Sequence, residues 1–519
     1  MKKGLSIFLV LLMFMGSGCI QKKQVNTKEI RDYIIYNLGK MPEDLTMLKS
    51  NNLRDEDLLL CLFEGLVSTN EKGEIVPGLA SEWKISDDKL SYTFKIRNNA
   101  KWSDGSSITT EDFIEFFKEL LKSNENIYKQ QLYCIFGAKD YADNKIDFNE
   151  VAIIEKDNET LEIRLNYPCT YFLNMLSKPM YALKKNLTSF KNWKNNYSNI
   201  VYSGPFNIKN ISTNMDIELS KNEMYWDKDN VPSSKIVIKN EESSALALAN
   251  YKWDETDIIL NPPANEIKES IEDNEIISFT SINGISLNFN LKKQGISRDI
   301  NFRKSINYCI DREEISKKIL GQEAQKFIES GANDKIFFDK HKDLIKAKDF
   351  LNKSTYKGEK IRIAYLNTLE NSKKIIEDIE KSLGKASIKT YIEECDNERF
   401  NQIIKDGDYD IVVTEYLSEN SYPLAFLEKW TTNSTTNIFG YTNWNYDNLI
   451  LKTKITSDSE SAKKLLNSAQ DVLYEDIPFM PICFFKNTVC KKETVEGVEI
   501  NKRGNVLLKK AYLNKENNN

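Results

Sequence analysis

The segment from Phe63 to Phe113 constrains the fold more than any other part of this 519-residue chain. Three turn sequences divide it into short pieces: Asn70–Gly73, Pro77-Gly78 and Ser103–Gly105 all end in glycine, which tolerates the backbone angles of tight turns. Pieces of this length between turns are typical of short strands and of the loops that join them to helices.

Two patterns inside this segment predict a strand followed by a helix. Apolar residues alternate with polar ones from Leu90 to Arg97, which is the period of a half-buried strand. Thr109 and Asp112 then fit a capping box at a helix start. The apolar face of the predicted helix consists of Phe113, Phe116, Phe117, Leu120 and Leu121. The patterns therefore indicate a mixed α/β module.

The same segment resembles the signature of the bacterial extracellular solute-binding proteins that serve peptide importers of the ATP-binding-cassette type. It has an F-E-G-L start, a V-P-x-L-A-x-x-W middle and a K-W-S-D-G end, in that order. Further similar passages are S-G-P-F with K-N-E-M-Y-W-D, the run from Arg298 to Ile315, and Gly440-Tyr441. The resemblance covers essentially the whole mature chain, and it points to the oligopeptide- and dipeptide-binding lipoproteins of family 5.

This resemblance implies an α/β architecture with two lobes, a periplasmic-binding-protein-like fold of type II, cluster C, with an extra domain inserted in the first lobe. The expected divisions are a signal peptide at 1–18, a lipidated tether at 19–29, a first-lobe core from 30–54, 181–275 and 491–515, the inserted second domain at 55–180, and a second lobe at 276–490. A chain of this length is expected to hold more than one hydrophobic core.

The first residues predict export. Lys2 and Lys3 precede an apolar run, Leu5–Met15, and small residues then lead to Cys19. That run is shorter than the roughly 20 residues needed to cross a bilayer. The end of the signal resembles a lipobox, which implies lipidation of Cys19 and a lipid-anchored protein on the extracytoplasmic face of the cell membrane.

Charge and cysteine content narrow the possible partners. The formal charge of -5 is spread over mixed acidic and basic residues without a basic stripe, so no nucleic-acid partner is expected. The protein is expected to be a monomer. No cysteine pair has the C-x-x-C spacing, and we assign no disulfides. The cysteines other than Cys19 are Cys61, Cys134, Cys169, Cys309, Cys395, Cys483 and Cys490.

Catalytic and metal-binding motifs are missing from the sequence. The single histidine, His341, lies in a lysine-rich run, and the chain has neither a G-x-S-x-G nor an H-E-x-x-H motif. We expect no enzyme activity, no metal site and no cofactor, and an exported hydrolase is a remote alternative. A closer alternative is the same fold binding an oligosaccharide, a signalling peptide or a metal chelate.

The function implied by the resemblance is capture of extracellular oligopeptides by hinge closure and delivery to the permease subunits of an ABC transporter. In the family an acidic residue binds the α-ammonium group of the peptide. Counting back from Pro423 assigns Glu419 to that position and Tyr416 to a neighbouring aromatic position. The other candidate peptide-binding residues are Asn261, Tyr128, Tyr441, Lys40, Met41 and Pro42. How the peptide's C-terminus is recognised stays open, because Ile411–Glu415 contains no arginine.

Overall fold

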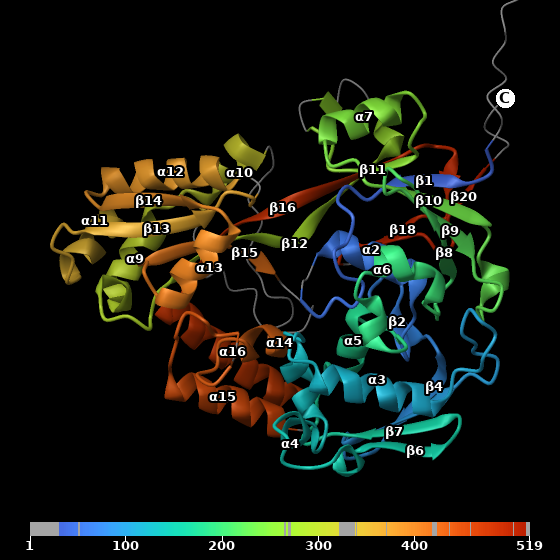
Figure 1. Cartoon of the computed structure of the whole chain (residues 1–519). Coiled ribbons are helices and arrows are strands. Elements are labelled where there is room, and N and C mark those ends of the chain that lie inside the picture. The colour runs from blue at the N-terminus through green and yellow to red at the C-terminus, as the bar shows by residue number, and fades with distance from the viewer. Residues whose placement is uncertain are drawn as a thin grey trace, which may run out of the picture.

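The computed structural model describes residues 31–49, 52–263, 266–267, 271–320, 338, 340–369, 371–417, 423–434, 436–456, 458–501 and 503–514. Within these residues one large mixed sheet runs through both lobes of the molecule (Figure 1), in the order β14-β13-β15-β12-β16-β11-β1-β10-β9-β8. Its strands are β1 (Ile34–Asn37), β8 (Phe206–Ile211), β9 (Ile217–Lys221), β10 (Lys235–Lys239), β11 (Ile258–Leu260), β12 (Ile276–Phe289), β13 (Lys360–Leu366), β14 (Lys389–Cys395), β15 (Ile411–Leu417) and β16 (Phe479–Lys491).

One end of this sheet belongs to a doubly wound lobe. β13 pairs in parallel with β14 and with β15, which is the pairing expected where strands alternate with helices along the chain. Ile375, Ile376, Ile379 and Leu383 form the buried stripe of α12 at helical spacing. The helices of this lobe are α9 (Ile300–Cys309), α10 (Arg312–Leu320), α11 (Leu344–Lys353), α12 (Ser372–Lys385), α13 (Asn397–Asp406), α14 (Pro423–Glu428), α15 (Trp444–Ile455) and α16 (Ser459–Asp476).

The other end of the sheet is built around β1. This strand pairs in parallel with β10 and β11, and helix α7 (Ser244–Lys252) connects the latter two strands. β9 and β8 continue the sheet in antiparallel pairing. Helix α2 (Leu53–Leu62) belongs to the same lobe, and its buried Glu56 forms an ion pair of 2.7 Å with Arg503. The C-terminal segment is thereby attached to α2.

A separate four-stranded sheet, β4-β5-β7-β6, lies below this lobe in Figure 1, with helix α3 (Thr110–Lys122) beside it. The predicted alternation and the predicted capping box are both confirmed: Tyr92, Phe94 and Ile96 are buried, and Thr109 and Asp112 cap α3. The strands are β4 (Ala80–Ile85), β5 (Ser91–Ile96), β6 (Ile153–Asp157) and β7 (Thr160–Arg164).

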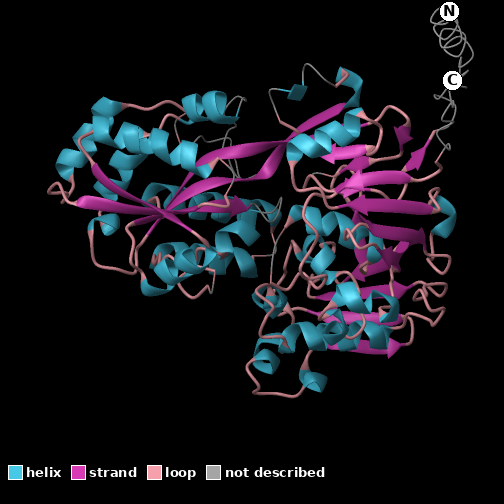
Figure 2. Cartoon of the chain, turned by 45° about the horizontal axis from the view of Figure 1, so that its top comes forward, coloured by secondary structure: helices cyan, strands magenta, loops and turns pink. Residues whose placement is uncertain are grey.

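Two long antiparallel strands, β12 and β16, connect the lobes (Figure 2). The first part of β12 pairs with the part of β16 that also contacts β11, and its second part pairs with both β15 and β16. Between Thr280 and Gly284 the register shifts, because β12 has more residues there than β16. An irregularity of this kind bends a strand pair locally, so the connection between the lobes has a defined bending point.

The lobes also touch away from these strands. The Tyr171 hydroxyl, just before helix α5 (Phe172–Leu176), donates a hydrogen bond of 2.6 Å to the Glu428 carboxylate at the end of α14. Lys454 of α15 forms an ion pair of 2.6 Å with the same carboxylate and lies over the Tyr167 ring. The hydrogen bond joins residues that are 257 positions apart, and it links the two lobes in the present arrangement.

Candidate ligand-binding site

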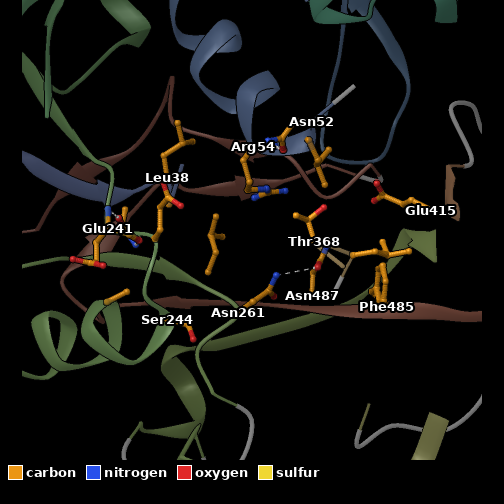
Figure 3. A pocket seen from close by; sticks show the side chains of 17 residues that line it. Leu38, Asn52, Arg54, Glu241, Ser244, Asn261, Thr368, Glu415, Phe485 and Asn487 are labelled. Carbon is orange, nitrogen blue, oxygen red and sulfur yellow. Dashed lines mark hydrogen bonds between the residues drawn. The ribbon is translucent and has the colours of Figure 1, made fainter. Parts of the chain in front are cut away.

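A cavity of about 570 Å³ lies between the two lobes, beside β16. Figure 3 shows its lining side chains, which come from both lobes and from the connecting strand. The labelled residues are Leu38, Asn52, Arg54, Glu241, Ser244, Asn261, Thr368, Glu415, Phe485 and Asn487. A space of this size is within the range of pockets that hold small ligands.

Strand direction explains why the cavity forms at this place. The parallel strands β1, β10 and β11 all end at its wall, where Leu38, Glu241 and Asn261 follow them. From the other lobe, Thr368 follows β13, and Glu415 lies near the end of β15. In open α/β sheets ligands bind outside the carboxyl ends of the strands, and here two sets of such ends face each other across one space.

Asn261 is part of this wall in an unusual conformation. Its φ of 44° is in the left-handed region, which asparagine tolerates better than most residues. The side-chain oxygen accepts a hydrogen bond of 2.8 Å from the Thr488 backbone N–H, and its Nδ2 donates to Asn487 Oδ1 at 3.3 Å. The Asn261 carboxamide thus continues the ladder between β11 and β16 while lining the cavity.

The first turn of α2 contributes a buried charge network to the opposite side. Arg54 forms an ion pair of 2.9 Å with Asp57 and donates a hydrogen bond of 2.5 Å to the Gly504 carbonyl. The Tyr36 hydroxyl donates to Asp57 at 2.6 Å. Burial raises the pKa of Asp57 to about 6, although Arg54 and the hydrogen bonds from Tyr36, Asn505 and Val506 act in the opposite direction. The carboxylate therefore depends on its partners to remain charged.

The loop after β1 contains three of the predicted residues. Lys40 is exposed and lies 3.6 Å from Glu43 in an ion pair, whereas Met41 and Pro42 are buried. They follow Gly39, which lines the cavity, but their own side chains are not among its lining residues. These residues adjoin the wall of the cavity without forming it.

The predicted aromatic residues do not lie together at the cavity. Tyr128 is buried and precedes the 3-10 helix Lys129–Cys134, while Tyr441 is buried and donates a hydrogen bond of 2.8 Å to Asp476; neither lines the cavity. Tyr416 lies in β15, where its backbone is opposite Gly284 and next to the cavity residue Glu415. Glu419 lies outside the described residues.

Several cavity residues were not among the predicted ones, notably Arg54, Glu241, Thr368, Glu415 and Asn487. A signal for three of them was present in the sequence. Apolar runs of strand length, Ile236–Ile238, Ile361–Leu366 and Tyr409–Tyr416, precede Glu241 and Thr368 and contain Glu415, and the rule for parallel strands places such residues at the ligand side. Arg54 and Asn487 had no such signal, since one opens a helix and the other lies within a long strand.

The described residues contain no group of three or more histidine, cysteine or acidic side chains that could hold a metal ion. The cysteines Cys61, Cys134, Cys169, Cys309, Cys395, Cys483 and Cys490 are all buried free thiols. Among the helices described, none has the length and apolar character of a membrane span.

Two α/β lobes that share crossing strands and line one cavity between them have the architecture of a solute-binding protein. A family model agrees: the model of bacterial extracellular solute-binding proteins, family 5 Middle, matches residues 74–438. The chain belongs to this family of bacterial extracellular solute-binding proteins. The predicted two-lobed α/β fold is thereby confirmed.

Similar proteins extend over nearly the whole chain. The dipeptide-binding protein DppE of Bacillus subtilis is 28% identical, with 87% of each chain covered. The oligopeptide-binding protein OppA of the same organism is 27% identical over 99% of this chain and 100% of the relative. The solved structure of the murein tripeptide binding protein MppA of Escherichia coli has the same fold, with a TM-score of 0.81, 23% identity, and coverage of 93% of this chain and 99% of that one.

Proposed function

We propose that this chain captures extracellular oligopeptides by closing its two lobes around them and delivers them to the permease of an ABC-type peptide importer. The observation that carries this proposal is the cavity at the meeting point of two sets of parallel strand ends, beside the bending point of β12 and β16. Relatives named for dipeptide and oligopeptide binding support a peptide as the ligand. Binding and transfer of a peptide require no catalytic group.

The proposed ligand contacts extend the cavity wall that the structure describes. Asn261 and Tyr416 lie on or next to this wall, and we place the peptide's α-ammonium group against Glu419, which follows β15. A carboxylate and an ammonium group enclosed together are strong only as a pair, because removing one leaves the other charge buried. The Lys40–Pro42 loop would border the same groove.

Glu419→Gln tests the peptide function directly. With a free-amino pentapeptide, calorimetric titration of the full chain should show an affinity loss of about tenfold or more, because the neutral amide cannot pair with the ammonium group. The N-acetylated form of the same peptide should lose less than about twofold. Equal losses for both peptides would reject the ammonium contact. If the parent chain binds no peptide but binds oligosaccharides or metal chelates, one of these alternative solutes is the ligand.

Hinge closure has its own test at the contact between Tyr171 and Glu428. Tyr171→Phe removes a hydrogen bond to a carboxylate, so we expect the ligand-free protein to have a larger radius of gyration in X-ray scattering and a peptide affinity lower by about three- to tenfold. Tyr181→Phe is the matched control, because Tyr181 is equally buried and donates to Gln131 within one lobe. Unchanged scattering and affinity in Tyr171→Phe would show that this contact does not favour the closed form.

The remaining assignments complete the proposal. Lipidation of Cys19 would anchor the protein to the membrane, residues 1–18 would be removed as a signal peptide, and the mature protein would act as a monomer. The chain would divide into a first-lobe core of 30–54, 181–275 and 491–515, an inserted domain of 55–180, and a second lobe of 276–490. The four-stranded sheet of β4 to β7 and the parallel strands β13 to β15 support this division. Cys19→Ala should release the protein from membranes into the soluble fraction.

A further inference from the structure

Arg54 is the one cation among the described residues that line the cavity. The acidic residues of the wall are Glu241, Glu242 and Glu415. In Figure 3 the Arg54 side chain ends between Leu38 and Thr368, with Glu241 on one side and Glu415 on the other. Arg54 is also paired with Asp57, and among the described lining residues its guanidinium is the group that can offer charged N–H donors to a negative group on the ligand.

The protein holds the Arg54 guanidinium in a fixed orientation. Its Nη1 contacts Asp57 Oδ2 at 2.9 Å, and its Nη2 donates to the Gly504 carbonyl at 2.5 Å. A guanidinium has five N–H groups, so these two contacts do not use all of its donors. The side chain is only 19% exposed, and this remaining surface lines the cavity. The group is therefore oriented before any ligand arrives.

Charge favours a carboxylate at this position. Burial lowers the pKa of Arg54, but Asp57 and Tyr36 raise it by more, so the guanidinium stays positive. Arginine and carboxylate groups form short, bidentate, charge-assisted hydrogen bonds, which are stronger when water is excluded. Glu241, Glu242 and Glu415 line the same cavity, and their negative charge disfavours a second anion elsewhere on its wall.

We propose that Arg54 binds a carboxylate of the captured peptide, either its C-terminal carboxylate or one acidic side chain. This inference rests on the proposed peptide-binding function and adds a specificity determinant to it. A neutral group at the same place would leave the Arg54 donors without an acceptor in the closed cavity, and such unpaired groups oppose binding. Selection among peptides would then depend on where they carry negative charge.

The test uses calorimetric titration of the full chain with four synthetic pentapeptides. Pentaalanine is compared with its C-terminal amide, and a central glutamate version is compared with its glutamine counterpart. With the parent protein, one of the two neutral peptides, the C-terminal amide or the glutamine version, should bind more weakly than the acidic peptide it is compared with, by about tenfold or more. Weaker binding of the amide identifies the C-terminal carboxylate as the group bound, whereas weaker binding of the glutamine peptide identifies a side chain.

Arg54→Lys should reduce this preference for the acid to less than about threefold, because an ammonium cannot reproduce the bidentate geometry. The matched control is Arg503→Lys, since Arg503 is 20% exposed, pairs with buried Glu56 at 2.7 Å on the same helix, and does not line the cavity. Arg503→Lys should keep the full preference for the acidic peptide, even if it unfolds at a denaturant concentration similar to that of Arg54→Lys.

Each outcome decides the proposal. If both neutral peptides bind the parent as tightly as their acids, the proposal is wrong whether or not Arg54→Lys folds. Equal loss of both members of a pair in Arg54→Lys also overturns it, while leaving peptide binding itself intact. If the parent binds no peptide at all, the proposed function fails, and the role of Arg54 fails with it.

Discussion

Replacing Gly284 with alanine is expected to remove about 3 kcal/mol or more of folding stability, which is a large part of the total for a typical protein. A Cβ at this position would lie 2.0 Å from the carbonyl oxygen of Cys483 and 3.0 Å from its carbonyl carbon. Both atoms belong to the backbone of β16, which pairs with β12 here, so neither can rotate away. Urea unfolding followed by tryptophan fluorescence, together with the soluble yield, measures the loss.

Gly284 also terminates the register shift between the two crossing strands. Forcing β12 and β16 apart at this residue would therefore disturb the connection between the lobes as well as the local packing. Gly384→Ala is the control, because Gly384 lies in α12 and has no atom within 4 Å of an added Cβ. That variant should be as stable as the parent or more stable by about 0.5–1 kcal/mol. A Gly284→Ala protein that unfolds at the parent's urea concentration would contradict the close approach seen here.

Local patterns gave the correct elements where the determining interactions are local. The alternation from Leu90 to Arg97 and the capping box at Thr109 depend on neighbouring residues, and both were predicted correctly. The apolar run Pro478–Phe485 predicts a strand, but β16 continues beyond this run to Lys491. Its second part contains Lys486, Asn487 and Thr488, because a strand that borders a cavity has no need for a continuous apolar run.

The site was harder to predict, since residue type does not separate groove aromatics from core aromatics. Tyr441 has an apolar ring and a hydroxyl that Asp476 satisfies inside the lobe, and this arrangement suits a core position. The opposite difficulty applies to the run from Arg54 to Asp57: four consecutive charged residues are typical of a solvated helix face. Here Asp55, Glu56 and Asp57 are buried, and partners such as Arg503 are more than 400 positions away, so no local pattern reveals them.

Asp55, within this buried run, is expected to make the stability of the protein fall as the pH rises. Burial raises the pKa of Asp55 from 3.8 to about 7, and the negative charge of Asp57 adds to the shift. Glu43 and Glu56 act in the same direction, whereas Lys40 opposes them. A carboxyl group with a raised folded-state pKa contributes stability that is fully present below its unfolded pKa and is lost as the pH rises through the folded value.

Asp55→Asn removes this ionisation. We expect the variant to equal the parent within about 1 kcal/mol near pH 4 and to be more stable by about 2–4 kcal/mol near pH 8, with the difference growing between those values. Urea unfolding at a series of pH values measures it. Asp57, whose pKa burial raises to about 6, titrates in both proteins, and its charge raises the pKa of Asp55, so the measured difference includes the repulsion between these two carboxylates.

The control is Glu111→Gln, which removes an exposed carboxylate from the first turn of α3. Its stability should follow that of the parent within about 0.5 kcal/mol across the same pH range, because both the folded and the unfolded states solvate this group. If the free energies of unfolding of Asp55→Asn and the parent differ by the same amount from acid to alkaline pH, Asp55 is solvated like Glu111. The charge network that orients Arg54 toward the cavity would then be more accessible to water than its burial indicates, and a ligand carboxylate would gain less from binding there.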